Sequence, residues 1–402
     1  MQQILRFPKG FLWGTATSAH QIEGGLTNDW SDWEKSPRRL ADLKSQGLDS
    51  TEFISGSASN SWEHLDDDIA CVKQISNNAY RFSLDWSRIE PEEGVFDEAA
   101  IEKYHQFVIR LRAQGIEPFV TLWHWPLPLW LRDKGGWESA AIVKYFSRFT
   151  EKVAKAMPEV IFWLTLNEPN IYAGQSYLAG VWPPQKRNPI SYLRVLQHLM
   201  RAHCAAYDVI KKIKPATQVG VVTNNMDFDA APGIINKLIA SGARWWWNRR
   251  FLNYIKYHQD IIGLNYYFRK GIRYGLENNT TDKISDIGWE LYPQHIRPVI
   301  DELKRYGKPV YITENGLADA GDKYRAWFLK EVLVATHAAI EAGADVRGYF
   351  HWSLIDNFEW SSGFAPKFGL FSVDHESWER SPRPSASVYA EIAKTNQVTI
   401  EE

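Results

Sequence analysis

Short apolar runs rich in β-branched and aromatic residues alternate along the chain with segments whose apolar residues recur at helical spacing. Runs of the first kind predict buried strands, and apolar positions three or four residues apart predict amphipathic helices. Eight strands are predicted: Phe11–Thr15, Ala79–Ser83, Glu117–Leu122, Ile161–Leu166, Val219–Val222, Ile261–Leu264, Val310–Thr313 and Gly348–Trp352. They recur at intervals of roughly 40 to 65 residues, as strand–helix units with functional loops do.

Helices are predicted between these strands, at Ser61–Gln74, Ala99–Gln114, Ala140–Met157, Leu193–Ile213, Pro298–Tyr306 and Lys323–Ala342. Strand and helix alternating eight times predict an α/β fold, a single (β/α)8 TIM barrel domain spanning 1–402. An open doubly wound sheet is the alternative, but no G-x-G-x-x-G follows an early strand. The polar stretch Gly25–Gly56 is expected to be a loop insertion after the first strand.

Composition narrows the classes of partner. Of 402 residues, 45% are hydrophobic and 23% charged, with a net charge of −2 and both signs scattered along the chain. This balance favours neither nucleic acid nor a polyanion as partner. No apolar run is long enough to span a membrane, so no membrane partner is expected. The N-terminus lacks the apolar core of a secretory signal, and the distant Cys71 and Cys204 do not form a disulfide framework, which favours a cytoplasmic protein.

No cofactor or metal is expected. His64 with Asp66–Asp68 is interpreted as a solvated helix face, because charged residues mostly lie outside. The sequons within Asn278–Thr281 are not expected to carry glycans in a protein without a secretion signal.

Polar and aromatic residues follow almost every predicted strand. The C-terminal strand ends of a barrel form its active site, so these side chains are expected to converge there. Several of the 19 tryptophans lie in polar, Gly- and Pro-rich stretches, where their faces could pack against sugar rings.

Two strand-end carboxylates, Glu168 and Glu314, are each flanked by an asparagine. Cleavage of a glycosidic bond needs one carboxyl group to protonate the leaving oxygen and a second to attack the anomeric carbon or activate water. A single strand-end glutamate is equally well explained as an acid that favours a helix N-terminus. Two of them in a site rich in aromatic residues favour catalysis.

The chain resembles glycoside hydrolase family 1, the β-glucosidase family. The similarity is carried by RFPKGFLWGTATSAHQIEG, YRFSLDWSRIEP, TLWHWPLPLWL, WLTLNEPN, DIIGLNYY, YITENG, GYFHWSLIDNFEW and KFGLFSVD, which together include every predicted strand except the fifth. The resemblance implies a retaining β-glycosidase without a cofactor that hydrolyses small β-glycosides or oligosaccharides.

The resemblance also implies roles for individual residues. Glu168 in NEP is similar to the acid/base, and Glu314 in TENG to the nucleophile. Arg81, Asn265 and Tyr267 correspond to the residues that support the nucleophile. The sugar-binding set comprises Gln21, His124, Trp125, Asn167, Trp352, Glu359 and Trp360. Arginine and phenol donors are expected to lower the pKa of Glu314, whose charge then keeps Glu168 protonated.

The sequence leaves some alternatives open. A transglycosylase would use the same two steps, and a sugar-binding barrel that has lost catalysis should lack one of the two carboxylates. Glucose, galactose and fucose remain possible glycones, and the oligomeric state is open. The segment between the fifth and sixth strands is short for the family and contains Trp245–Trp247, which match none of its motifs. These tryptophans are interpreted as core or loop packing, as a subsite wall or as an oligomer contact. If they form a wall, we expect them to replace part of the wall of the entrance.

Overall fold

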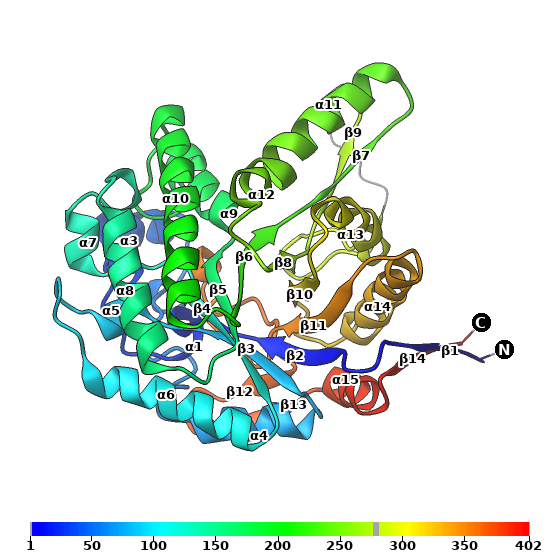
Figure 1. Ribbon diagram of the computed structural model, residues 1–402, viewed down its shortest axis with the longest axis horizontal. Helices are drawn as coiled ribbons and strands as arrows, with labels where there is room; N and C mark the ends of the chain where they lie inside the picture. Colours follow the sequence, from blue (N-terminus) through cyan, green and yellow to red (C-terminus); the bar gives the residue numbers. More distant parts are fainter. Residues whose placement is uncertain (1, 276–280, 402) are drawn as a thin grey trace.

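A computed structural model describes residues 2–275 and 281–401 of the chain. Eight parallel strands close into a barrel with helices around it (Figure 1). Around the barrel they are β10 (Val310–Asn315), β11 (Val346–Trp352), β2 (Leu12–Ala16), β3 (Ala79–Ser83), β4 (Glu117–Trp123), β5 (Phe162–Asn167), β6 (Gln218–Asn224) and β8 (Ile261–Asn265). The predicted barrel is confirmed, and each predicted strand lies within two residues of an observed one.

All six predicted helices are present in the outer layer. They are α4 (Leu65–Gln74), α6 (Glu98–Ala113), α8 (Ile142–Ala156), α10 (Pro189–Ile213), α13 (Ile296–Leu303) and α14 (Arg325–Glu341). Ser61 does not begin α4, which starts at Leu65 with His64 at its N-cap, and the Ser61 hydroxyl accepts a hydrogen bond from Arg380 at 3.5 Å.

The stretch Gly25–Gly56, predicted to be a loop insertion, contains two short α-helices, α2 (Asp29–Glu34) and α3 (Pro37–Ser45), and the 3₁₀ helix Ser50–Phe53. The Asn28 side chain accepts from the backbone N–H groups of Trp30 and Ser31, and Ser36 caps α3 in the same way. The prediction was wrong because end caps, rather than apolar periodicity, define such short helices. The remaining α-helices of the described residues are α1 (Ala19–Ile22), α5 (Trp86–Ile89), α7 (Leu129–Asp133), α9 (Pro169–Ala173), α11 (Ile234–Arg244), α12 (Arg250–Ile255) and α15 (Pro384–Thr395).

Aromatic rings fill the barrel near the start of its strands. Phe119 and Phe162 stack with centroids 4.2 Å apart, and Phe350 and Tyr311 pack against Phe119. Beside this end, β1 (Gln2–Arg6) pairs with β14 (Gln397–Glu401), which brings the chain termini together (Figure 1). The functional end of the barrel is therefore the opposite one, where the strands finish.

A lobe projects from the barrel between β6 and β8 (Figure 1). It consists of α11 packed on the parallel pair β7 (Asp227–Ala230) and β9 (Arg269–Ile272). A π-helical turn, Trp245–Arg249, joins α11 to α12. The predicted sequons at Asn278–Thr281 fall largely outside the described residues. In the described ranges, no helix is long and apolar enough to cross a bilayer, and no cluster of three or more potential ligands is placed to hold a metal ion.

Candidate active site

The C-terminal strand ends surround a cavity of about 310 Å³. Nine of the predicted site residues line it: Gln21, His124, Trp125, Glu168, Tyr267, Glu314, Trp352, Glu359 and Trp360. The other three, Arg81, Asn167 and Asn265, are buried directly behind these and hydrogen-bond to them. The structure thus brings the whole predicted set together.

Glu314 lies on β10 and receives a donor at each carboxylate oxygen. The Arg81 guanidinium donates to Oε1, and the Tyr267 hydroxyl donates to Oε2 at 3.0 Å. The chain then turns at Gly316, where a Cβ atom would lie 1.8 Å from the carbonyl oxygen of Trp352. Only glycine therefore allows β10 and β11 to approach closely enough to place Glu314 beside Trp352.

Glu168 follows β5 and is buried, but it receives only neutral donors. Asn265 and Asn224 donate to its Oε1 at 2.7 and 3.0 Å. Asn265 Nδ2 also lies 3.3 Å from Asn167 Oδ1, so it connects the acid with the polar residues behind it. The two glutamates therefore differ in their partners: one has a cation and a phenol, the other has two amides.

A hydrogen-bond chain fixes the orientation of His124. Arg81 donates to Asn167 Oδ1 at 2.7 Å, so Asn167 Nδ2 points to His124 Nε2 at 2.9 Å. Burial, followed by the charge of Arg81, lowers the pKa of His124 well below its ordinary value, so the ring is neutral. Its Nε2 accepts, and its Nδ1 therefore carries the proton. Nδ1 has no partner among the described residues and is available to a ligand hydroxyl.

The two glutamates have shifted pKa values for different reasons. Burial, then the nearby Glu314, raises the pKa of Glu168 to about 8. Burial also raises the pKa of Glu314, while Arg81 and Tyr267 oppose this rise. The expected net lowering of the pKa of Glu314 was therefore wrong, because desolvation outweighs the two donors. A proton shared between the pair nevertheless favours Glu168, because only Glu314 has a cationic partner.

Glu359 faces the cavity from the loop after β11. The Gln21 amide donates to its Oε2 at 3.2 Å and to the carbonyl oxygen of Phe358 at 3.0 Å. Burial, then the charge of Glu314, raises the pKa of Glu359 to about 8. The residues that line the cavity include no Lys or Arg, so a ligand meets three carboxyl groups and neutral donors.

Tryptophans form the rim of the cavity. The Trp125 ring centroid lies 4.5 Å from those of both Trp182 and Trp360, and the indole of Trp125 donates to the carbonyl oxygen of Asn167 at 3.0 Å. Trp125, Trp360 and Glu168 have left-handed backbones with φ of +88°, +51° and +42°. Bulky residues rarely adopt this conformation, and such strain concentrates at functional sites.

Comparison with known proteins gives the family. The family model described as Glycosyl hydrolase family 1 matches residues 3–232 and 246–398. Beta-glucosidase A of Thermotoga maritima is 30% identical, with 98% of this chain and 99% of that protein covered. A beta-galactosidase of Pyrococcus woesei is 31% identical over 98% of each chain.

Solved structures agree. A beta-glycosidase from Pyrococcus horikoshii superposes with a TM-score of 0.89 at 37% identity, covering 98% of this chain and 96% of the other. The Thermotoga maritima beta-glucosidase in complex with glucoimidazole gives a TM-score of 0.89 at 29% identity, with 97% and 99% covered. The chain belongs to glycosyl hydrolase family 1. It is therefore an enzyme, a glycoside hydrolase on a (β/α)8 barrel.

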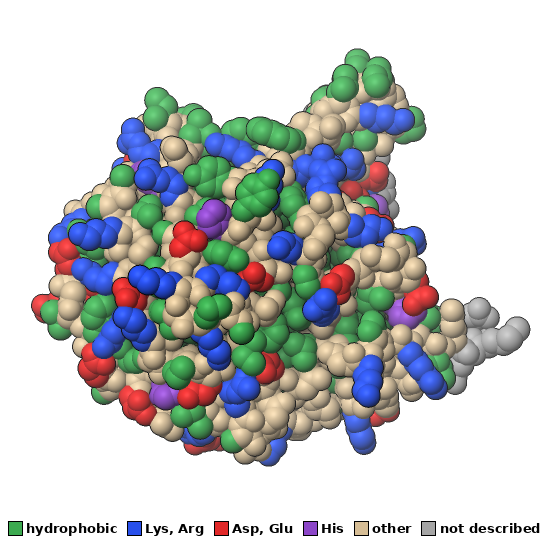
Figure 2. Space-filling view, in the orientation of Figure 1, with side chains coloured by type: hydrophobic (Ala, Val, Ile, Leu, Met, Phe, Trp, Pro, Cys, Tyr) green, Lys and Arg blue, Asp and Glu red, His purple; other side chains and the backbone are tan. Residues whose placement is uncertain are grey.

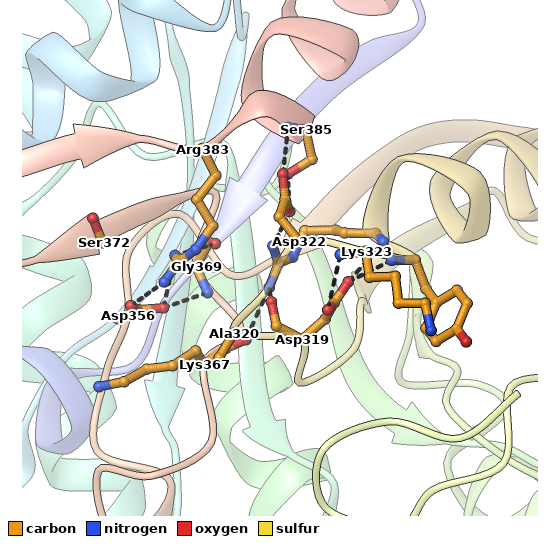
Figure 3. Close-up of polar contacts among 12 residues, drawn as sticks. Asp319, Ala320, Asp322, Lys323, Asp356, Lys367, Gly369, Ser372, Arg383 and Ser385 are labelled. Atoms are coloured by element: carbon orange, nitrogen blue, oxygen red, sulfur yellow. Dashed lines mark hydrogen bonds and ion pairs between the residues drawn. The ribbon is translucent and has the colours of Figure 1, made fainter.

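A polar network behind the site of this glycosyl hydrolase supports the loop that carries Glu359 (Figure 3). Arg383 forms two hydrogen bonds to the Asp356 carboxylate, at 2.7 and 3.1 Å, and a third to the carbonyl oxygen of Gly369 at 2.8 Å. Arg325 joins this loop to the one after β10, because it donates to the carbonyl oxygens of Asp319 and Lys367. The loops that follow β10 and β11 are thus held as one unit.

Sequence reasoning missed part of the hydrolase site. Asn224 donates to Glu168, and Phe268 and Trp289 line the cavity. Asn224 ends β6, two residues after the fifth predicted strand, so its position gave a usable signal. Trp289 lies in an irregular loop that has no periodicity to place it. Trp245–Trp247 lie near the same end of the barrel, where Trp246 packs against Tyr192, but they are not among the lining residues. The expectation that they form part of the entrance wall therefore stays a prediction.

Proposed function

We propose that this glycosyl hydrolase is a retaining β-glycosidase that acts on non-reducing terminal β-glucosides, with activity on β-galactosides and β-fucosides. Glu314 is the nucleophile and Glu168 the general acid/base. The observation that carries this assignment is the unequal environment of the two carboxyl groups. Glu314 accepts hydrogen bonds from the Arg81 guanidinium and the Tyr267 hydroxyl. Glu168 accepts hydrogen bonds from two side-chain amides, and its pKa is raised to about 8. The relatives named as beta-glucosidases and a beta-galactosidase support the choice of substrate.

In the first half of the reaction, a Glu314 carboxylate oxygen attacks the anomeric carbon. The bond from that carbon to the glycosidic oxygen breaks, and its electron pair takes the proton of Glu168, so the aglycone leaves as an alcohol. Arg81 and Tyr267 hold Glu314 ionised and oriented for this attack. The product is a glycosyl ester on Glu314.

In the second half, Glu168 is a carboxylate and acts as the base. It takes a proton from water, whose oxygen attacks the anomeric carbon, and the bond to Glu314 breaks. Two displacements at one carbon restore the β-configuration. Asn224 and Asn265 keep the Glu168 carboxyl in place for both proton transfers, because each donates to its Oε1.

The remaining predicted residues bind the sugar. Trp352 and Trp360 offer flat faces to the apolar side of a pyranose. Gln21, His124 and Glu359 form the polar set that faces the sugar hydroxyls. Asn167 orients His124 from behind the cavity wall, and Trp125, whose indole N–H is bonded to the carbonyl oxygen of Asn167, packs at the rim. His124 Nδ1 and the second Glu359 oxygen are suited to direct hydrogen bonds with the glycone, since the structure gives them no hydrogen-bond partner in the described residues.

We further propose that 1–402 form one catalytic domain that resides in the cytoplasm. One barrel carries every residue of the site, and the family match runs almost from end to end. Cys71 and Cys204 are both free, as is usual in a reducing compartment.

The test begins with stereochemistry. Proton NMR of a β-glucoside digest should show the β-anomer as first product, since each displacement inverts the anomeric carbon. A slow fluorinated glycoside should label the peptide that contains Glu314, as mass spectrometry would show. Initial release of the α-anomer would contradict the proposal.

Two variants separate the roles. Glu314→Ala should lose turnover on every β-glycoside. Glu168→Ala should lose most activity on poor leaving groups and least on good ones, because a good leaving group needs little protonation. Azide should rescue Glu168→Ala and give the β-glycosyl azide. Equal losses in both variants, whatever the leaving group, would refute the division of labour.

A further inference from the structure

Helix α11 carries its large apolar side chains on the outside. Ile234, Ile235 and Leu238 have 71%, 56% and 64% of their surface exposed. Ile239 is exposed as well, and Trp245 and Trp246 extend the same side into the next turn. These positions, i, i+1, i+4, i+5, i+11 and i+12, share one face of a helix. Figure 2 shows hydrophobic side chains gathered at the end of the projecting lobe.

The inner face of α11 is the polar or small one. Asn236 and Ala240 are the buried residues of the helix. The Asn236 side chain donates to the carbonyl oxygen of Pro232 at 3.1 Å and accepts from the backbone N–H of Tyr274 at 2.6 Å. A surface helix of a globular protein normally has the reverse arrangement. The outer face of α11 is therefore suited to contact something other than water.

None of the groups that take part in the proposed reaction lies on this helix. The family match covers residues 3–232 and 246–398, so α11 falls in the gap between the two parts. None of its residues lines the catalytic cavity. The lobe nevertheless stands at the rim of that cavity, because Phe268 lines the cavity and β9 begins at the next residue.

The charge of the chain around α11 indicates what kind of partner surface the exposed apolar face would contact. Between Ala230 and Gln259 the chain has five cations and no Asp or Glu. Arg244 and Arg249 pair with Asp227 and Glu302 from other segments. For Lys237, Arg250 and Lys256, the described part of the chain offers no carboxylate within ion-pair distance, and the last two lie 4.4 and 4.7 Å from the ring centroids of Trp246 and Tyr257.

We propose that α11 and the Trp245–Trp246 turn form a docking surface for an anionic lipid bilayer. Aliphatic side chains enter the acyl boundary, the tryptophans sit at the headgroup level, and the lysine and arginine side chains meet lipid phosphates. A second copy of this chain fits less well, because a two-fold contact would place like charges against one another. The expectation of no membrane partner considered only spanning segments and does not bear on this peripheral helix.

Vesicle co-sedimentation of the full chain tests the proposal. The chain should bind vesicles of mixed phosphatidylcholine and phosphatidylglycerol, and should bind pure phosphatidylcholine much more weakly. Added salt should release it, because the Debye length falls from roughly 10 Å at 0.1 M to 3 Å at 1 M. The double variant Ile235→Glu, Leu238→Glu should lower the partition coefficient at least about tenfold and keep full turnover of a soluble aryl glucoside.

The matched control is Ile4→Glu, which changes an isoleucine that is 50% exposed in β1, away from the lobe. This variant should bind vesicles like the unmodified chain. Equal binding by the double variant, equal binding to both lipids, or no binding at all would overturn the proposal. So would a dimer in sedimentation velocity that the double variant dissolves, because the second copy would then occupy the face.

Discussion

At the scale of single residues, the protonation of Glu168 sets the alkaline limit of the reaction. Burial and the charge of Glu314 raise its pKa to about 8, so the acid is protonated below that pH and loses its proton above it. We expect kcat/KM for a poor leaving group to fall as pH rises through about 8. Glu168→Gln, assayed with an activated aryl glucoside, should not show this fall, the alkaline limb of the pH profile of kcat/KM.

Glu359 provides the control for this assignment, because its pKa is also raised to about 8. If Glu168 governs the limb, Glu359→Gln should retain it at reduced overall activity. A limb that disappears in Glu359→Gln and persists in Glu168→Gln would show that sugar binding, rather than proton donation, titrates in this window.

Glu359 also decides how the site treats charge on the substrate. The cavity lining has three carboxyl groups and no Lys or Arg, so a phosphate dianion on the sugar would find no cationic partner there, and it would be repelled by ionised Glu314 and, above pH about 8, by ionised Glu359 as well. Like charges brought together cost several kcal/mol, which predicts at least about a 100-fold preference for aryl β-glucoside over its 6-phosphate. Glu359→Ser should narrow the gap while slowing the neutral substrate. Faster turnover of the phosphorylated substrate by the unmodified enzyme would contradict this reading.

Residue positions were predictable where a strand ended. Glu168, Glu314 and His124 follow clear apolar runs, so the strand pattern and the barrel rule together place them at one end. The partners of these residues were less predictable. Asn265 was expected to support the nucleophile, and it does lower the pKa of Glu314, but its hydrogen bond at 2.7 Å is to Glu168. Such a choice depends on side-chain geometry between strands, which no periodicity encodes.

At the scale of elements, the Arg383–Asp356 pair supports the loop after β11 (Figure 3). Both side chains are largely buried, and removal of one partner from a buried pair typically costs about 3–5 kcal/mol. Arg383→Met should therefore lower thermal stability and also kcat/KM, because the loop carries Glu359 and Trp360. Thermal scans and aryl glucoside kinetics measure the two effects.

The exposed ion pair between Arg347, on β11, and Asp345, which directly precedes β11, is the matched control for the buried Arg383–Asp356 pair. Exposed pairs contribute roughly 0–1 kcal/mol, so Arg347→Met should change neither stability nor turnover appreciably. A comparable loss in the two variants would mean that the buried network has no special role in holding the loop.

At the scale of the whole molecule, the paired termini and the aromatic packing that stabilise the barrel lie at one end, and the catalytic groups lie at the other. Periodicity predicted the eight strands and the major helices because each buries a regular apolar face. The capped helices α2 and α3 and the lobe were not predictable in that way. Helix α11 exposes its apolar face. Apolar residues at helical spacing normally predict a helix packed on the core, but in α11 the same spacing places them on the surface.

The paired termini make this separation testable. Strand β14 pairs with β1, and the Asn396 side chain donates to the carbonyl oxygen of Phe7 at 2.8 Å, near the aromatic end of the barrel. Truncation after Asn396 removes the strand and the fully buried Val398, whose burial alone is worth about 1.5–3 kcal/mol. The truncated chain should unfold at a lower temperature yet keep its kcat at 25 °C, because the catalytic groups lie at the far end. Thr399→Ala, which trims a half-buried side chain and keeps the strand, should shift the unfolding temperature far less. A loss of kcat in the truncated chain that matches its loss of stability would show that the two ends are coupled.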